Sequence, residues 1–237
     1  MKKLLTLTIV LVLFGIAVSA VLAEPKEKEP LDKITFIHYK DGEIKIKGSA
    51  ARAPTCYSLM GIKWNNLPVS YVINPDGYDK PFVTSAIFAS SETWDSSTSK
   101  ELFNNVYGID PSATWDDTPD KVDYKNEYVF GLYSDSNVIA VTNVWYTRFG
   151  RQIVDYDVLF NTYYTWKDCL IPGTDCSKAM DLQNIATHET GHGLGLADIY
   201  NNACSAVTMY GYSWYGDTGK RTLEQPDITG LQKLYGA

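Results

Sequence analysis

Residues 188–198 read His188-Glu189-Thr190-Gly191-His192-Gly193-Leu194-Gly195-Leu196-Ala197-Asp198. Two histidines four positions apart on a helix lie on one face, with their Cβ atoms about 5–6 Å apart. Both imidazoles can therefore bind one zinc ion at about 2.0–2.1 Å. Glu189 lies between them, where a carboxylate can take a proton from an activated water molecule. This stretch predicts a helix that carries a hydrolytic zinc site, with Glu189 as the catalytic base.

The third metal ligand has two candidates. The chain contains three histidines, so His38, far upstream, is the one imidazole left beside the helical pair. Asp198 follows His192 by six residues, it is ionised at neutral pH, and carboxylate is a permitted zinc ligand. Gly195 lets the chain leave the helix sharply between them, because glycine tolerates positive φ. We expect Asp198 to be the ligand and His38 to be a surface or half-buried strand residue.

Three glycines in this stretch argue against an ordinary buried helix. Gly191, Gly193 and Gly195 occur within five positions, and a helix-interior glycine costs about 1 kcal/mol relative to alanine. Such a run predicts close approach of other groups or a reversal of the chain.

The stretch resembles the metzincin signature of zinc metallopeptidases, which usually ends in a third histidine. Further segments resemble the matrixin branch and its secreted prokaryotic relatives. Residues 63–64 and 67–71 resemble the opening strand of that domain, and residues 150–161 resemble its substrate-flanking strand. Residues 204–212 resemble its methionine turn, and residues 220–223 and 227–236 resemble its closing helix. The resemblance implies an α+β, zincin-like fold, in which a twisted mixed sheet packs with a long helix, the active-site helix and a C-terminal helix. It also implies that strand 152–161 borders the cleft as an exposed edge.

Local patterns place the main elements. Apolar or small residues at helical spacing predict a helix over 82–98, with Trp94 in the core and Pro81 near its start. Segments rich in Val, Ile, Tyr and Phe predict strands at 127–133, 138–148 and 152–161. The zinc helix is expected at 181–194 with Asp181 as N-cap, and a last helix at about 226–235. Alternation over 34–47 around Asp41-Gly42 predicts a hairpin.

Two departures from the family pattern have consequences. Asp198 in place of histidine resembles snapalysin-type variants and makes the site less positive, so we expect a pH optimum higher than that of three-histidine relatives. The histidines that hold a second, structural zinc in animal relatives are missing from this chain. Calcium is common in the family. An acidic cluster could bind it here, formed by Asp116, Asp117, Asp120 and Asp123. The alternative is that these carboxylates lie in solvated turns and bind no metal.

The N-terminal residues predict export. Lys2 and Lys3 precede an uncharged stretch that ends in small residues, as in a signal peptide spanning residues 1–23, although an uncleaved stretch of that length can also anchor a chain in a bilayer. Residues 24–55 then form an arm or short pro-segment, and residues 56–237 the metallopeptidase domain. A net charge of −7 without a basic tract argues against nucleic acid and anionic lipid as partners. We expect a secreted monomer without a stable membrane partner once the leader is removed.

Four cysteines in an exported chain predict two disulfides. Cys169 and Cys176 flank a turn-rich loop and are expected to pair, which leaves Cys56 for Cys204. The alternative makes Cys56 a latency thiolate on zinc, as in matrixin pro-segments, but Arg52-Ala53-Pro54-Thr55-Cys56 matches that motif poorly.

The predicted reaction is zinc-assisted hydrolysis of peptide bonds in extended protein substrates. His188, His192 and Asp198 would hold the metal, and Glu189 would deprotonate the water and protonate the leaving amine. Met209 would lie beneath the ligands, and Tyr210–Tyr212 would wall the pocket that follows the scissile bond. The competing hypotheses are a catalytically silent, zinc-stabilised surface or adhesion module, and a gluzincin-type peptidase whose third ligand is a distant glutamate. The intact Glu189 argues against the first, and the spacing of Gly195, Asp198 and Met209 argues against the second.

Overall fold

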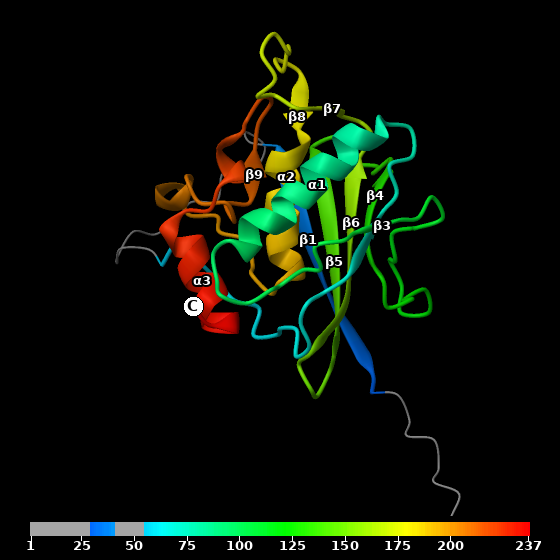
Figure 1. Cartoon of the computed structure of the whole chain (residues 1–237), viewed down its shortest axis with the longest axis vertical. Helices are drawn as coiled ribbons and strands as arrows, with labels where there is room; N and C mark the ends of the chain where they lie inside the picture. The colour runs from blue at the N-terminus through cyan, green and yellow to red at the C-terminus, as the bar shows by residue number, and fades with distance from the viewer. Residues whose placement is uncertain (1–28, 41–54) are drawn as a thin grey trace, which may run out of the picture.

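The computed structural model describes residues 29–40 and 55–237. Its main sheet has seven strands in the order β3-β2-β4-β6-β5-β1-β9 (Figure 1). Neighbouring strands are parallel except for the β1–β5 and β5–β6 pairs. The strands are β1 (Leu31–Lys40), β2 (Tyr71–Ile73), β3 (Gly108–Ile109), β4 (Asn126–Gly131), β5 (Val138–Thr147), β6 (Ile153–Asn161) and β9 (Tyr212–Ser213). β7 (Thr165–Lys167) and β8 (Ala179–Asp181) form a separate parallel pair.

Three α-helices complete the described part of the fold, and together with the mixed sheet they confirm the expected α+β architecture. They are α1 (Lys80–Asp95), α2 (Leu182–Gly193) and α3 (Gln225–Tyr235), with short 3-10 turns η1 (Asn202–Cys204) and η2 (Gly219–Arg221). Asp79 caps α1 through Phe82 N at 3.0 Å, so this helix begins two residues before the predicted start. Among the described residues, no helix has the length and apolarity needed to cross a bilayer.

The core lies between the sheet and the α1–α2 pair, which cross in front of the sheet (Figure 1). Trp94 is fully buried, as predicted, and its indole Nε1–H donates to the carbonyl of Thr187 on α2 at 2.8 Å. This bond joins α1 to the helix that carries the predicted metal ligands. Buried indole N–H groups need such a partner, so Trp94 both fills space and fixes the helix position.

The edge strand differs from the prediction. Residues 152–161 were expected at an exposed edge, but β6 lies inside the sheet between β4 and β5, and most of its residues are buried. β5 is antiparallel to both of its neighbours, β6 and β1, and it contacts α2 more extensively than β6 does. Two adjacent strands with similar apolar patterns give no local signal of where each lies in the sheet, because periodicity indicates which face is buried and not which strand is the neighbour.

The segment predicted as an N-terminal arm contributes a strand to the sheet. β1 pairs with β5 in antiparallel register from Leu31↔Thr147 to Tyr39↔Val138, and its end pairs with β9 in parallel. The predicted hairpin extends into residues 41–54, which lie outside the described residues, as does the predicted leader.

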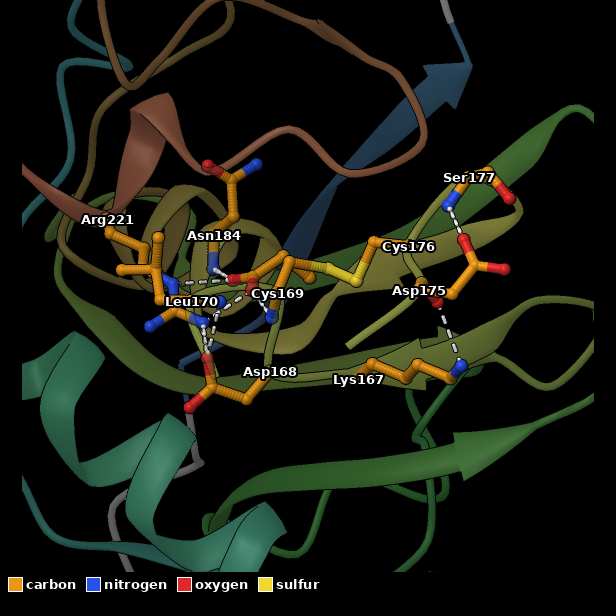
Figure 2. Close-up of a disulfide and its surroundings, with 10 residues drawn as sticks. Lys167, Asp168, Cys169, Leu170, Asp175, Cys176, Ser177, Asn184 and Arg221 are labelled. Carbon is orange, nitrogen blue, oxygen red and sulfur yellow. Dashed lines mark hydrogen bonds and ion pairs between the residues drawn. A yellow bond between two sulfur atoms is a disulfide. The ribbon is translucent and has the colours of Figure 1, made fainter. Parts of the chain in front are cut away.

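Both predicted disulfides are present. Cys56 joins Cys204, so the thiolate alternative for Cys56 is wrong, and Cys169 joins Cys176. Figure 2 shows the second bridge closing the loop beside Arg221 and Asp168. Asp181, at the base of this loop, caps α2 through Asn184 N at 2.9 Å, accepts from Cys169 N at 2.8 Å and pairs with Arg221. The loop therefore fixes the start of α2.

Candidate metal centre

His188 and His192 lie on one buried face of α2, as their spacing predicts. Their Nε2 atoms are 3.1 Å apart, and both residues are at most 1% exposed. The other ring nitrogens are held by backbone carbonyls. Nδ1 of His188 donates to Thr208 O at 2.7 Å, and Nδ1 of His192 donates to Leu196 O at 2.9 Å. With the proton on Nδ1, each Nε2 keeps its lone pair for a metal ion.

Asp198 reaches the same point from the loop after the helix. Gly195 has φ +100°, and a Cβ there would meet the carbonyl oxygen of Ile62 at 2.5 Å, so this position requires glycine. Oδ1 of Asp198 lies 3.1 Å from Nε2 of His188 and 3.4 Å from Nε2 of His192. The hydroxyl of Tyr200 donates to Oδ2 at 2.8 Å and holds the carboxylate in this orientation.

The three ligand atoms fit a zinc ion. Ligands about 2.0–2.1 Å from a tetrahedral ion are about 3.3–3.4 Å apart. The three observed separations are 3.1, 3.1 and 3.4 Å, so each lies within about 0.3 Å of that spacing. Oδ1 of Asp198 is buried and makes no hydrogen bond, and a buried carboxylate oxygen without a partner is costly. A cation between the three atoms would satisfy it.

His38 belongs to a second cluster and is completely buried, so the expectation of a surface or half-buried residue is wrong. Its Nδ1 lies 2.9 Å from Oε1 of Glu189, and its Nε2 lies 3.0 Å from Oγ of Ser213. The cluster of His38, His188 and Glu189 also has metal-binding residue types. It is the poorer zinc site, because both nitrogens of His38 already have hydrogen-bond partners.

Glu189 is fully buried, and each of its carboxylate oxygens has a partner. Oε1 contacts His38, and Oε2 accepts from Oγ1 of Thr142 on β5 at 2.5 Å. Burial raises the pKa of Glu189 to about 7, against the opposing effects of His192 and Thr142. Burial also lowers the pKa of His38 well below its usual range, so its neutral ring donates from Nδ1 to Glu189. A carboxyl group with a pKa near neutrality suits proton transfer in both directions.

Met209 lies under the ligands as the methionine-turn resemblance implied. A Cβ on Gly191 would collide with its sulfur and with the indole of Trp94, and a Cβ on Gly193 would meet the Tyr156 ring at 2.9 Å. The glycine run on α2 is therefore explained by close packing, as predicted. Asp227 of α3 fixes the loop, because its carboxylate accepts from the backbone N–H groups of Thr208 at 2.9 Å and Met209 at 3.2 Å.

Comparison with protein families gives one match. The model of the matrixin family, described as "Matrixin", matches residues 71–236. The chain belongs to the matrixin family. Membership supports zinc metallopeptidase activity and implies protein substrates. A search of curated proteins finds no match. The matrixin match begins at the first residue of β2, so β1 lies outside it.

Several residues around the matrixin centre were not predicted as part of it. Thr142, Tyr200, Ser213 and Lys220 all contact the ligands, Glu189 or His38. Lys220 is buried in η2, with Nζ bound to Tyr210 O and 3.5 Å from Nδ1 of His188, and burial lowers its pKa to about 8. Each reaches the site from a different element, so only Lys220, which belongs to the closing-helix motif at 220–223, had any local signal.

The predicted acidic cluster of this matrixin is rearranged. Asp116 and Asp123 lie with Asp155 of β6, and carboxylate oxygens of the three residues are within 4.8 Å of one another. Asp117 instead pairs with the exposed Lys121, and Asp120 is exposed. Oδ1 of Asp155 and Oδ1 of the neighbouring Asp157 are buried without a hydrogen-bond partner. Burial raises the pKa of Asp155, of Asp157 and of Glu127.

Proposed function

We propose that this matrixin is an endopeptidase that hydrolyses peptide bonds in extended protein segments, with His188, His192 and Asp198 as zinc ligands and Glu189 as general base. The observation that carries the proposal is the convergence of the two Nε2 atoms and Oδ1 of Asp198 at tetrahedral ligand spacing. The unpartnered Oδ1 of Asp198 supports the carboxylate as third ligand.

Each residue has a defined task in this reaction. Zinc, when bound, supplies a Lewis acid that polarises the scissile carbonyl and acidifies water. Glu189 takes the proton from the attacking water on a carboxylate oxygen and delivers it to the nitrogen of the leaving amine. Thr142 orients this carboxylate through Oε2, and the backbone carbonyls of Thr208 and Leu196 hold the imidazoles.

The peptidase recognises its substrate mainly through the substrate's backbone. β5 packs against α2, and its edge away from β6 is paired with β1, so a peptide that took the place of β1 there would make main-chain hydrogen bonds that are independent of sequence. Tyr212 belongs to β9, which β1 separates from β5, so β9 would form the second side of such a channel.

The test compares the parent protein with Glu189→Gln and Asp198→Ala. We expect the parent and Glu189→Gln to bind one zinc per chain, and Glu189→Gln to lose casein hydrolysis by at least about a hundredfold. Asp198→Ala should lose zinc affinity by about 10–100-fold or more. Metal content after dialysis and rates on fluorescent casein measure both effects. Full hydrolysis by Glu189→Gln would refute its role, and stoichiometric zinc in Asp198→Ala would refute the ligand set.

We further propose that the chain is exported. Lys2, Lys3 and the following uncharged stretch support a cleaved leader, with an uncleaved membrane anchor as the alternative. The two disulfides fit an oxidising compartment. The N-terminal sequence of the protein recovered from the culture medium tests this, since a chain found only in the membrane fraction and starting at Met1 contradicts cleavage.

Calcium is the second metal that we propose, at Asp116, Asp123 and Asp155. Oxygen-only ligands suit this cation, and the buried, unpartnered Oδ1 of Asp155 needs a compensating charge. The site joins the loop before β4 to the start of β6, so its occupancy should stabilise the sheet rather than take part in catalysis.

A further inference from the structure

The loop closed by Cys169 and Cys176 packs against the segment that follows the expected substrate pocket. This segment, residues 214–221, begins directly after β9 and ends with η2. The N–H of Gly216 donates to the carbonyl of Ala179 at 2.9 Å. Gly216 has φ +71°, and a Cβ there would lie 3.3 Å from the carbonyl oxygen of Cys176, so the two backbones are in close contact.

Arg221 holds the far end of the same segment. Its Nη2 donates to Oδ1 of Asp168 at 2.5 Å, as Figure 2 shows, and its Nε donates to Oδ1 of Asp181 at 2.8 Å. The side chains of Arg221 and Asp181 are 11% and 0% exposed. Asp168 precedes the disulfide loop and Asp181 follows it, so one guanidinium group binds both ends of the loop. A planar guanidinium group shared between two carboxylates fixes direction as well as distance.

Lys220 connects this fixed end to the expected wall of the pocket. Its backbone N–H donates to Oδ1 of Asn184, in the first turn of α2, at 2.6 Å. Its buried Nζ donates to the carbonyl of Tyr210, which is expected to wall the pocket. Lys220 is the neighbour of Arg221 in the chain, so a displacement of Arg221 would also displace the group that holds Tyr210.

We propose that residues 168–181, closed by their disulfide, are a clamp that positions the pocket wall at residues 210–221, with Arg221 as the positioning residue. The inference rests on the proposed peptidase function. Without the clamp, the wall spends part of its time in arrangements that do not bind substrate, and the apparent affinity falls with the fraction of competent molecules. The catalytic groups in the bound state are unchanged, so KM rises while kcat is kept.

The experiment uses the chain without its leader, loaded with zinc, and measures initial rates over a range of fluorescent casein concentrations. Arg221→Ala should raise KM about tenfold, which corresponds to a wall that is competent about a tenth of the time, with kcat within about twofold of the parent. Lys178→Ala is the matched control, because Lys178 carries the same charge and is exposed in the same loop. Its KM should equal that of the parent.

Opening the loop tests whether the disulfide belongs to the same clamp. The variant Cys169→Ser/Cys176→Ser should also raise KM. Combined with Arg221→Ala, it should raise KM by less than the product of the two separate effects, because both changes act on one clamp. Effects that multiply would show that the loop and Arg221 act independently, which contradicts the proposal.

A milder variant covers the case in which Arg221→Ala does not fold, since that change leaves the buried Asp181 without its counter-ion. Asp168→Asn removes only the charge of the more exposed partner and keeps an oxygen that can accept from Leu170 N. It should raise KM about threefold, as expected for the loss of one partly exposed ion pair. An unchanged KM in this variant and in Cys169→Ser/Cys176→Ser overturns the clamp.

Hydrogen exchange provides a readout beyond hydrolysis. The amides of Gly216 and Lys220 are hydrogen-bonded to the clamp and to α2, so peptides covering residues 214–221 should exchange at least about tenfold faster in Arg221→Ala, whereas those covering α1 should keep the parent rate. A raised KM without faster exchange overturns the proposal, as does a lower kcat at constant KM. If no form hydrolyses casein, the peptidase function fails and exchange decides the clamp alone: faster exchange supports it, and the parent rate overturns it.

Discussion

Asp198 is the residue that separates this chain from the usual three-histidine pattern. Its carboxylate is less than one-tenth exposed, and Tyr200 holds Oδ2 while Oδ1 faces the two imidazoles. Burial raises the pKa of Asp198, but the neighbouring imidazoles outweigh this and keep it well below its usual range, so the proposed ligand is ionised near neutral pH. In the proposed centre, a third ligand with a negative charge would reduce the net charge around the metal, and the attacking water would then be acidified less.

Replacing Asp198 with His should move the acidic limb of kcat/KM to lower pH, because a neutral ligand leaves the centre more positive and the attacking water more acidic. The measurement is the pH profile of casein hydrolysis for parent and Asp198→His, each with its zinc content determined. Tyr200→Phe is a suitable control, since it keeps the carboxylate and removes only its hydrogen bond. An unmoved acidic limb in a zinc-loaded Asp198→His variant contradicts the charge argument.

At the scale of elements, α2 is held at both ends by groups from outside the helix. Asp181 caps its start, and the Trp64 indole donates to Gly193 O while the Tyr235 hydroxyl donates to Leu194 O at its end, each at 2.8 Å. Terminal N–H and C=O groups of a buried helix need such partners. The helix therefore keeps its position even though Gly191 and Gly193 weaken its local propensity.

The two N-caps offer a matched pair of substitutions. Asp79→Ala removes one capping bond and should lower the free energy of unfolding by about 1 kcal/mol. Asp181→Ala removes a cap, the bond from Cys169 N and one of the two carboxylate partners of the largely buried Arg221, so it should cost about 2–4 kcal/mol. Chemical denaturation with intact disulfides measures both. Equal losses would show that the contacts of Asp181 beyond the cap contribute nothing.

At the scale of the molecule, the buried carboxylates between the loop before β4 and β6 make stability depend on pH and on cations. Asp155 and Asp157 are fully buried, and burial raises their pKa values, as it raises that of Glu127 to about 7. A carboxyl group with a raised pKa in the folded state binds more protons there than in the unfolded state. The contribution of such a group to the free energy of unfolding is therefore lost as pH rises from the ordinary carboxyl pKa, about 4, toward the pKa in the folded state.

We expect the melting temperature in EGTA to fall between pH 5 and pH 8, and calcium to restore it at pH 8 but to have little effect at pH 5, where protons compete with it. Asp155→Asn should remove most of the calcium response, because it removes one charged ligand from the site. Asp117→Asn, in the same loop but paired with Lys121 at the surface, should respond to calcium like the parent. A melting temperature independent of calcium at pH 8 would refute the site.

The sequence alone determined what depends on neighbours along the chain. The pair His188 and His192, the reversal at Gly195, the cap of α2 and the short disulfide loop all arise from spacings of a few residues, and local geometry fixes such spacings. The tertiary structure decided which distant segments meet. It placed β5 rather than β6 beside the channel, joined Asp155 to Asp116, and brought His38, Thr142 and Lys220 to the catalytic helix. Strand alternation specifies which face of a strand is buried but not which strand lies next to it, because pairing partners are chosen by the packing of the whole sheet.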